Sequence, residues 1–164
     1  IDHLNALPTT ELREALHRCC GAHQWVTLMA QAKPFLDEED LKIKAAYYWE
    51  KMGEADILEA FTHHPRIGDI EGLRQRFAST RKWAGDEQAG SAEADEATLQ
   101  ALKSANDAYF ERFGFIFIVC ATGKSAQEML ALLKARLPND RDTELKVAAA
   151  EQLKITYLRL EKLP

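Results

Sequence analysis

The chain has 164 residues, 21 Lys plus Arg against 26 Asp plus Glu, and a formal net charge of −5. This length predicts one domain, residues 1–164, and 46% apolar residues are enough to build a sizeable core. The acidic balance argues against nucleic acid or an anionic membrane as a partner, and no apolar run is long enough to span a bilayer.

The cysteine content is low and unpatterned. Cys19, Cys20 and Cys120 form no CxxC pair, so neither a disulfide framework nor a structural zinc site is expected. No basic-then-apolar signal follows Ile1. We therefore expect a reducing compartment and a cytoplasmic protein.

Helical periodicity dominates the first half of the chain. It predicts, in order, a helix through Leu12 and Leu16 that Gly21 ends, a helix from Trp25 to Ala32 that stops at Pro34, a helix from Asp37 to Met52, and a short helix through Ile57 and Phe61 that finishes near Thr62–His64. A further short helix is expected to end at Phe77, whereas residues 79–90 are ambiguous.

The second half contains three more predicted helices. They run from Ser91 to Phe113 with Gly114 as the stop, from the capping box at Ser125 to Leu137, and from Pro138-Asn139-Asp140 over about 20 residues. The predicted fold is all-α, a single-domain bundle of about seven to nine helices with one short extended segment near 115–121.

The extended segment is Phe115 to Ala121, which is aromatic and β-branched and lies between two glycines. No second strand-like run is available to pair with it, yet buried backbone N–H and C=O groups need partners. A small planar ligand could supply some of them. Core packing by Phe115, Phe117 and Val119 is the alternative, and both hold if alternate residues face opposite ways.

Three places carry polar residues suited to chemistry. His64 precedes Pro65 at a helix end whose partial negative charge favours imidazolium, so His64 is expected to donate a proton near neutral pH, or simply to cap the helix. Glu87-Gln88 lies in a turn between two glycines, as a ligand contact or as a solvated acidic turn.

The third place is in the last helix. Arg159 falls on the apolar stripe of Leu145, Ala148 and Ile155, so its guanidinium needs an anionic partner, either an internal carboxylate or a substrate carboxylate. Arg136, before Leu137-Pro138, is interpreted as a helix-end cation.

Several motifs in this order resemble one family. They are His64-Pro65-Arg66-Ile67-Gly68-Asp69, Glu87-Gln88-Ala89-Gly90, Phe115 to Ala121, Arg136-Leu137-Pro138-Asn139-Asp140, Thr143-Glu144-Leu145 and Leu158-Arg159-Leu160. Over about Leu4 to Leu163 the chain resembles 2-oxo-4-hydroxy-4-carboxy-5-ureidoimidazoline (OHCU) decarboxylase, an enzyme family of purine breakdown.

The resemblance implies a cofactor-free, all-helical homodimer that converts OHCU to (S)-allantoin and CO2. By this resemblance the catalytic residues are His64 as proton donor, Glu87, and Arg159 near the substrate carboxylate. The substrate-binding residues are Pro65, Ala84, Gly85, Asp86, Glu87, Gln88, Phe117, Ile118, Val119, Cys120 and Ala121. Many relatives have a serine where this chain has Ala84, so one hydroxyl contact is missing or is supplied by another group.

Two other functions stay open at this level. A metal-dependent hydrolase of a cyclic amide would use Glu59, His63, His64 and Asp69, although no third ligand follows at familiar spacing and no metal is expected. A non-enzymatic helical adaptor would need a large exposed apolar stripe, which the sequence does not show.

Overall fold

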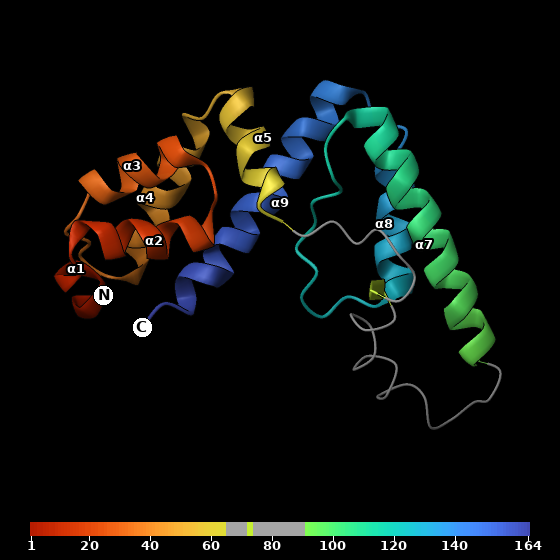
Figure 1. Cartoon of the computed structure of the whole chain (residues 1–164), viewed down its shortest axis with the longest axis horizontal. Coiled ribbons are helices and arrows are strands. Elements are labelled where there is room, and N and C mark those ends of the chain that lie inside the picture. The colour runs from red at the N-terminus through yellow and green to blue at the C-terminus, as the bar shows by residue number, and fades with distance from the viewer. Residues whose placement is uncertain (65–71, 74–90) are drawn as a thin grey trace. The chain divides into compact units, whose positions relative to one another are not determined.

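The computed structural model describes residues 1–64, 72–73 and 91–164, with side chains from residue 96 onward in the last range. Over these residues the chain is helical and contains no β-strand, which confirms the all-α prediction (Figure 1). The described helices are α1 (Asp2–Ala6), α2 (Thr9–Cys19), α3 (His23–Gln31), α4 (Glu38–Glu50), α5 (Glu54–Thr62), α7 (Ser91–Phe113), α8 (Ala126–Arg136) and α9 (Arg141–Glu161). The sequence pattern missed α1.

Local signals set most helix ends where they were predicted. The Asp37 carboxylate accepts the amide of Asp40 at 2.7 Å and caps α4. The Ser125 hydroxyl accepts the amide of Glu128 at 3.1 Å, and the Glu128 carboxylate reaches back to the Ser125 amide, which completes the capping box of α8. After α7 the chain turns at Gly114, whose φ of 80° suits glycine.

The chain divides into two compact units. The first comprises Ile1–His64, Ile118–Cys120 and Lys146–Pro164, and in it α3 packs against α2, α4 and α5. Two indoles tie its helices together: Trp25 Nε1 donates to the carbonyl of Ala45, and Trp49 Nε1 donates to the carbonyl of Ala149, each at 3.0 Å. The single domain 1–164 stays a prediction.

Of the second unit, the structure describes α7 and α8, which lie side by side, and the start of α9 (Figure 1). Its buried polar centre is Glu144, whose carboxylate accepts from Arg136 Nε at 2.5 Å and from the Tyr109 hydroxyl at 2.8 Å. Burial and this bond raise the pKa of Tyr109, which stays a protonated donor. Arg136 is the last residue of α8, as predicted for a helix-end cation, and it is in addition the buried ion-pair partner of Glu144.

The segment between α7 and α8 is neither helix nor strand. Buried and exposed side chains do not alternate along it, as they would in a strand. Phe115 and Ile118 are buried, whereas Phe117 and Val119 are half-buried. Phe117 stacks under the Arg136 guanidinium, 4.4 Å from its ring centre. The expected packing thus holds for Phe115, which is buried, and for half-buried Phe117, which packs on the buried Tyr109 and Arg136. Burial does not alternate along the segment, because a segment without a β-ladder is not held to the two-residue period of a strand.

None of the described helices combines the length and the apolar character needed to cross a membrane.

Candidate active site

The buried stripe of α9 is polar at most of its positions. It consists of Glu144, Ala148, Gln152, Thr156 and Leu160, spaced four residues apart. The predicted stripe of Leu145, Ala148 and Ile155 was displaced by one position, since Leu145 and Ile155 are only half-buried. Polar side chains occupy the buried face because each finds a hydrogen-bonding partner there, which offsets its desolvation.

His64 is one of those partners. It follows His63, the C-cap of α5, and its Nε2 lies 2.5 Å from Oε1 of Gln152. Gln152 is fully buried, and its Nε2 donates to the Thr156 hydroxyl at 3.2 Å. The imidazole of His64 is thereby attached to the middle of α9 within the first unit.

The environment of His64 differs from the sequence-based expectation. Burial lowers the pKa of His64, and the nearby charges of Arg159 and His63 lower it further, against the opposing effect of the Gln152 bond. The partial charge of the α5 end was expected to favour imidazolium, whereas burial, the largest of these effects, favours the neutral ring. His64 is therefore a neutral imidazole near neutral pH.

Arg159 lies two helical turns after Gln152 and is half-buried. Its Nη1 donates to the carbonyl of Arg18 at 3.3 Å, at the end of α2. Among the carboxylates that the structure describes, none forms an ion pair with this guanidinium. The interpretation as one half of an internal salt bridge therefore finds no support in the described residues.

The extended segment also meets α9, one residue before Gln152. The amide of Cys120 donates to Oε1 of Glu151 at 3.0 Å, and the other Glu151 oxygen pairs with Lys154 at 2.6 Å. Residues 118–120 belong to the first unit together with His64 and Arg159. Successive residues of α9 thus bond the segment and the imidazole.

The remaining predicted site residues lie outside the described part of the chain. They are Pro65, Asp69, Ala84, Gly85, Asp86, Glu87 and Gln88. Phe117 and Ala121 are described, but they group with the second unit. The structure therefore bonds His64 and Cys120 to neighbouring residues of α9 and lets the charge of Arg159 act on His64, and the place of Glu87 stays a prediction.

The residues named for a metal site have other roles where they are described. The Glu59 carboxylate accepts the amide of His23 at 2.9 Å, and the His63 ring meets that of His17 edge-on at 4.7 Å. Within residues 1–64, 72–73 and 91–164, no group of three His, Cys, Asp or Glu side chains could hold a metal ion.

The cysteines do not contribute a nucleophile from the core. Burial raises the pKa of Cys19 and of Cys20 to about 11, so both remain thiols at neutral pH.

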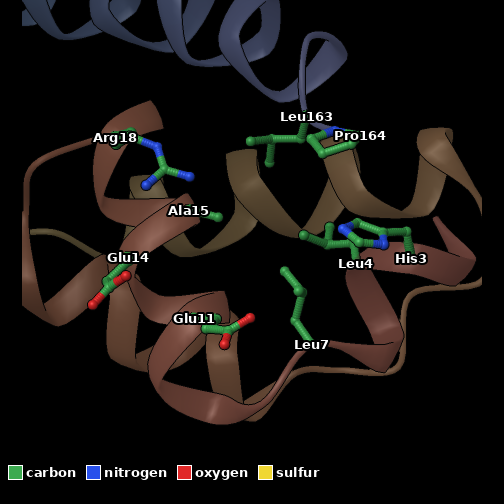
Figure 2. A pocket seen from close by; sticks show the side chains of 9 residues that line it. All are labelled: His3, Leu4, Leu7, Glu11, Glu14, Ala15, Arg18, Leu163 and Pro164. Carbon is green, nitrogen blue, oxygen red and sulfur yellow. The ribbon is translucent and has the colours of Figure 1, made fainter.

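A pocket of about 400 Å³ lies elsewhere in the first unit, between α1, α2 and the C-terminal residues (Figure 2). Glu11, Glu14 and Arg18 line it together with Leu4 and Leu163. No predicted site residue is among its lining residues.

Sequence reasoning missed Gln152, Thr156 and Glu151. The available signal was helical spacing, because Gln152, Thr156 and Arg159 stand at i, i+4 and i+7 and so share a face of α9. An apolar pattern was sought there instead.

Known proteins support one family. The sequence profile of OHCU decarboxylase matches residues 5–161. The uric acid degradation bifunctional protein TTL of Arabidopsis thaliana is 35% identical over 88% of this chain, which spans only 45% of that protein's length. The 2-oxo-4-hydroxy-4-carboxy-5-ureidoimidazoline decarboxylase of Xenopus laevis is 34% identical, with 80% of this chain and 78% of the relative aligned. A crystal structure of an OHCU decarboxylase in the presence of (S)-allantoin superposes with a TM-score of 0.71 at 35% identity, covering 89% of this chain and 94% of that one. The chain belongs to the OHCU decarboxylase family.

Proposed function

We propose that this chain is a carboxy-lyase that converts OHCU to (S)-allantoin and CO2 in urate degradation. Family membership supports this activity. The structural observation that carries it is the assembly on α9: His64 bonded to Gln152, Arg159 two turns further on, and the segment Ile118–Cys120 bonded to Glu151. An imidazole, a guanidinium and backbone amides suit an anionic, amide-rich ring.

The substrate itself can accept the electrons of the broken bond. Its C4 carries the hydroxyl and the carboxylate, and the neighbouring C5 carries the ureido group and a ring C=N bond. When the C4–carboxylate bond breaks, its electron pair forms a C4=C5 bond, and the C=N electrons pass to nitrogen, which takes one proton from solvent. The hydroxyl proton then leaves oxygen and a proton adds to C5, which gives the ketone and the stereocentre of allantoin. The ring is the electron sink, so this chemistry calls for no cofactor.

The chain's task is to orient the substrate and to handle protons. His64, neutral near pH 7, accepts the hydroxyl proton and returns it to one face of C5, which makes it the proton donor that sets the enantiomer. Arg159 binds the substrate carboxylate, and Glu87 bonds the hydroxyl or a ring nitrogen.

The other proposed contacts follow the resemblance. Pro65, Ala84–Gln88 and Phe117–Ala121 line the substrate, with the backbone of the last segment holding the ring and ureido groups. A cytoplasmic homodimer completes the proposal, and sedimentation velocity tests the dimer.

The decisive experiment follows freshly generated OHCU by circular dichroism with and without the protein, because OHCU also decays unaided. We expect (S)-allantoin to appear faster with the protein, in one enantiomer. An unchanged rate and a racemic product would contradict the proposal. Activity that disappears on chelation and returns with a divalent metal would instead support the metal-dependent hydrolase.

A further inference from the structure

We propose that Gln152 is a positioning residue that holds neutral His64 as the Nε2–H tautomer, so that Nδ1 is the nitrogen that exchanges the proton with the substrate. The tautomer follows from hydrogen bonds alone, whereas the role of Nδ1 rests on the proposed decarboxylation.

The argument starts at Thr156, which has one hydroxyl proton. Two backbone carbonyls, which can only accept, lie within reach of its Oγ1: that of Gln152 at 2.9 Å and that of Cys19 at 3.4 Å. The Cys20 sulfur is a further, weaker acceptor within reach of this hydroxyl. The shortest of the carbonyl contacts, that with Gln152, takes the hydroxyl proton. Toward the Gln152 side chain, 3.2 Å away, the Thr156 oxygen is then an acceptor.

This fixes the orientation of the Gln152 amide. Its NH2 group faces Thr156, so its Oε1 faces His64. The reverse orientation would take the hydroxyl proton of Thr156 from a 2.9 Å contact to a 3.2 Å one, and it would leave an amide N–H in front of the imidazole. Because Gln152 is fully buried, water does not compensate for a wrong orientation.

The last step concerns the imidazole. A carbonyl-type oxygen cannot donate, so His64 Nε2 carries the hydrogen of the 2.5 Å contact. In the neutral ring Nδ1 then holds a lone pair, which can take a proton from a substrate hydroxyl. Gln152 thus acts through His64 without touching the reacting atoms.

The experiment reads the tautomer directly in the full chain. Long-range 1H–15N correlation spectra of histidine-labelled protein at about pH 8, where histidine is neutral, distinguish protonated from unprotonated ring nitrogens. The His64→Gln spectrum identifies the His64 signals by their loss. We expect Nε2 protonated and Nδ1 unprotonated in the parent, and a mixture of tautomers in Gln152→Leu.

Three variants separate positioning from packing. Gln152→Glu keeps an acceptor toward Nε2–H, but its carboxylate raises the pKa of His64 and favours imidazolium, so Nδ1 should become protonated as well. Thr156→Val removes the hydroxyl that orients the Gln152 amide, so the amide can turn and the Nε2–H tautomer should be lost. Thr156→Ser retains the hydroxyl and should keep this tautomer. In Gln152→Leu and Thr156→Val, kcat for OHCU should fall by about 10²-fold, the lower end of a general acid–base contribution, with KM little changed. Thr156→Ser should stay much closer to the parent.

Failure of this inference and failure of the proposed function look different. A protonated Nδ1 in the parent overturns the tautomer assignment whether or not the protein turns over OHCU. If the predicted tautomer is found but the protein does not decarboxylate OHCU, the positioning of His64 by Gln152 is supported and the role of Nδ1 in proton exchange is overturned. If Gln152→Leu does not fold, the comparison of Thr156→Val with Thr156→Ser decides, and equal kcat values in that pair overturn the inference.

Discussion

The backbone of Gly21 lies directly against the imidazole of His63: a Cβ on residue 21 would come under 3.0 Å from three His63 side-chain atoms. The helix before Gly21 ends already at Cys19, and Cys20 is extended with a φ of −151°. Gly21 is therefore needed for close approach and not, as predicted, to end a helix. The contact fixes the residue immediately before His64.

Replacing Gly21 by Ala should push His63 away and disturb its neighbour His64, the proposed proton donor. We expect a loss of about 1–3 kcal/mol in unfolding free energy, typical of an overpacked site, together with lower decarboxylation. Urea unfolding and OHCU turnover measure the two effects. Gly53→Ala is the matched control, since among the described residues, and apart from its chain neighbours, the added Cβ would meet only Asp56 Oδ2, at 3.9 Å. If Gly21→Ala/His63→Ala is no more stable than Gly21→Ala, the clash is not the cause.

His64→Gln should lower kcat by about 10²-fold or more while the far-ultraviolet dichroism and the unfolding midpoint stay close to those of the parent. The reason is that the amide cannot shuttle a proton. Residual product should also lose its enantiomeric excess, because proton delivery to C5 is left to solvent. Turnover within threefold of the parent would refute the role of His64.

Arg159→Ala should act mainly on substrate binding, because it removes the guanidinium expected to bind the substrate carboxylate. A rise in KM of about tenfold, equivalent to about 1.4 kcal/mol, is expected in steady-state assays with OHCU. Lys162→Ala removes a charge three residues further on and controls for net charge. Should Arg159→Ala lower the unfolding midpoint while KM is unchanged, the role of Arg159 is structural.

Glu144→Gln should destabilise the fold strongly, since it leaves the Arg136 guanidinium charged in a buried site. Breaking such a pair costs about 3–5 kcal/mol. Lys103→Met disrupts the exposed pair with Asp107 and should cost less than about 1 kcal/mol. Equal unfolding midpoints for the two variants would show that the buried pair is no more important than the surface one.

The lowered pKa of His64 predicts a pH-dependent stability. In the unfolded chain His64 titrates near its ordinary value of about 6.5, whereas in the fold it binds a proton only at lower pH. Between the folded-state pKa and the unfolded-state pKa of His64, the unfolded state binds more protons than the fold. The contribution of neutral His64 to the free energy of unfolding is therefore complete above about pH 6.5 and is lost as the pH falls toward the folded-state pKa. Urea unfolding at a series of pH values should show the parent losing stability relative to His64→Gln on acidification. A difference that does not vary with pH would contradict the shift.

Short stretches of sequence determine where several helices begin and end. The capping residues Asp37 and Ser125, the stop at Gly114 and the helical period of α3, α4 and α7 act within a turn or two of the chain, so their effect could be predicted without knowing the fold.

Other features depend on residues far apart in the chain. His64 and Gln152 are separated by 88 positions, and no local pattern indicates that a buried amide will meet an imidazole. The burial of Arg136 against Glu144, the close approach of Gly21 to His63 and the neutral state of His64 were equally out of reach of the sequence. Helix ends are determined by bonds between neighbours in sequence, whereas burial, pKa and the partners of polar side chains depend on which distant segments exclude water, and that is decided only when the helices pack.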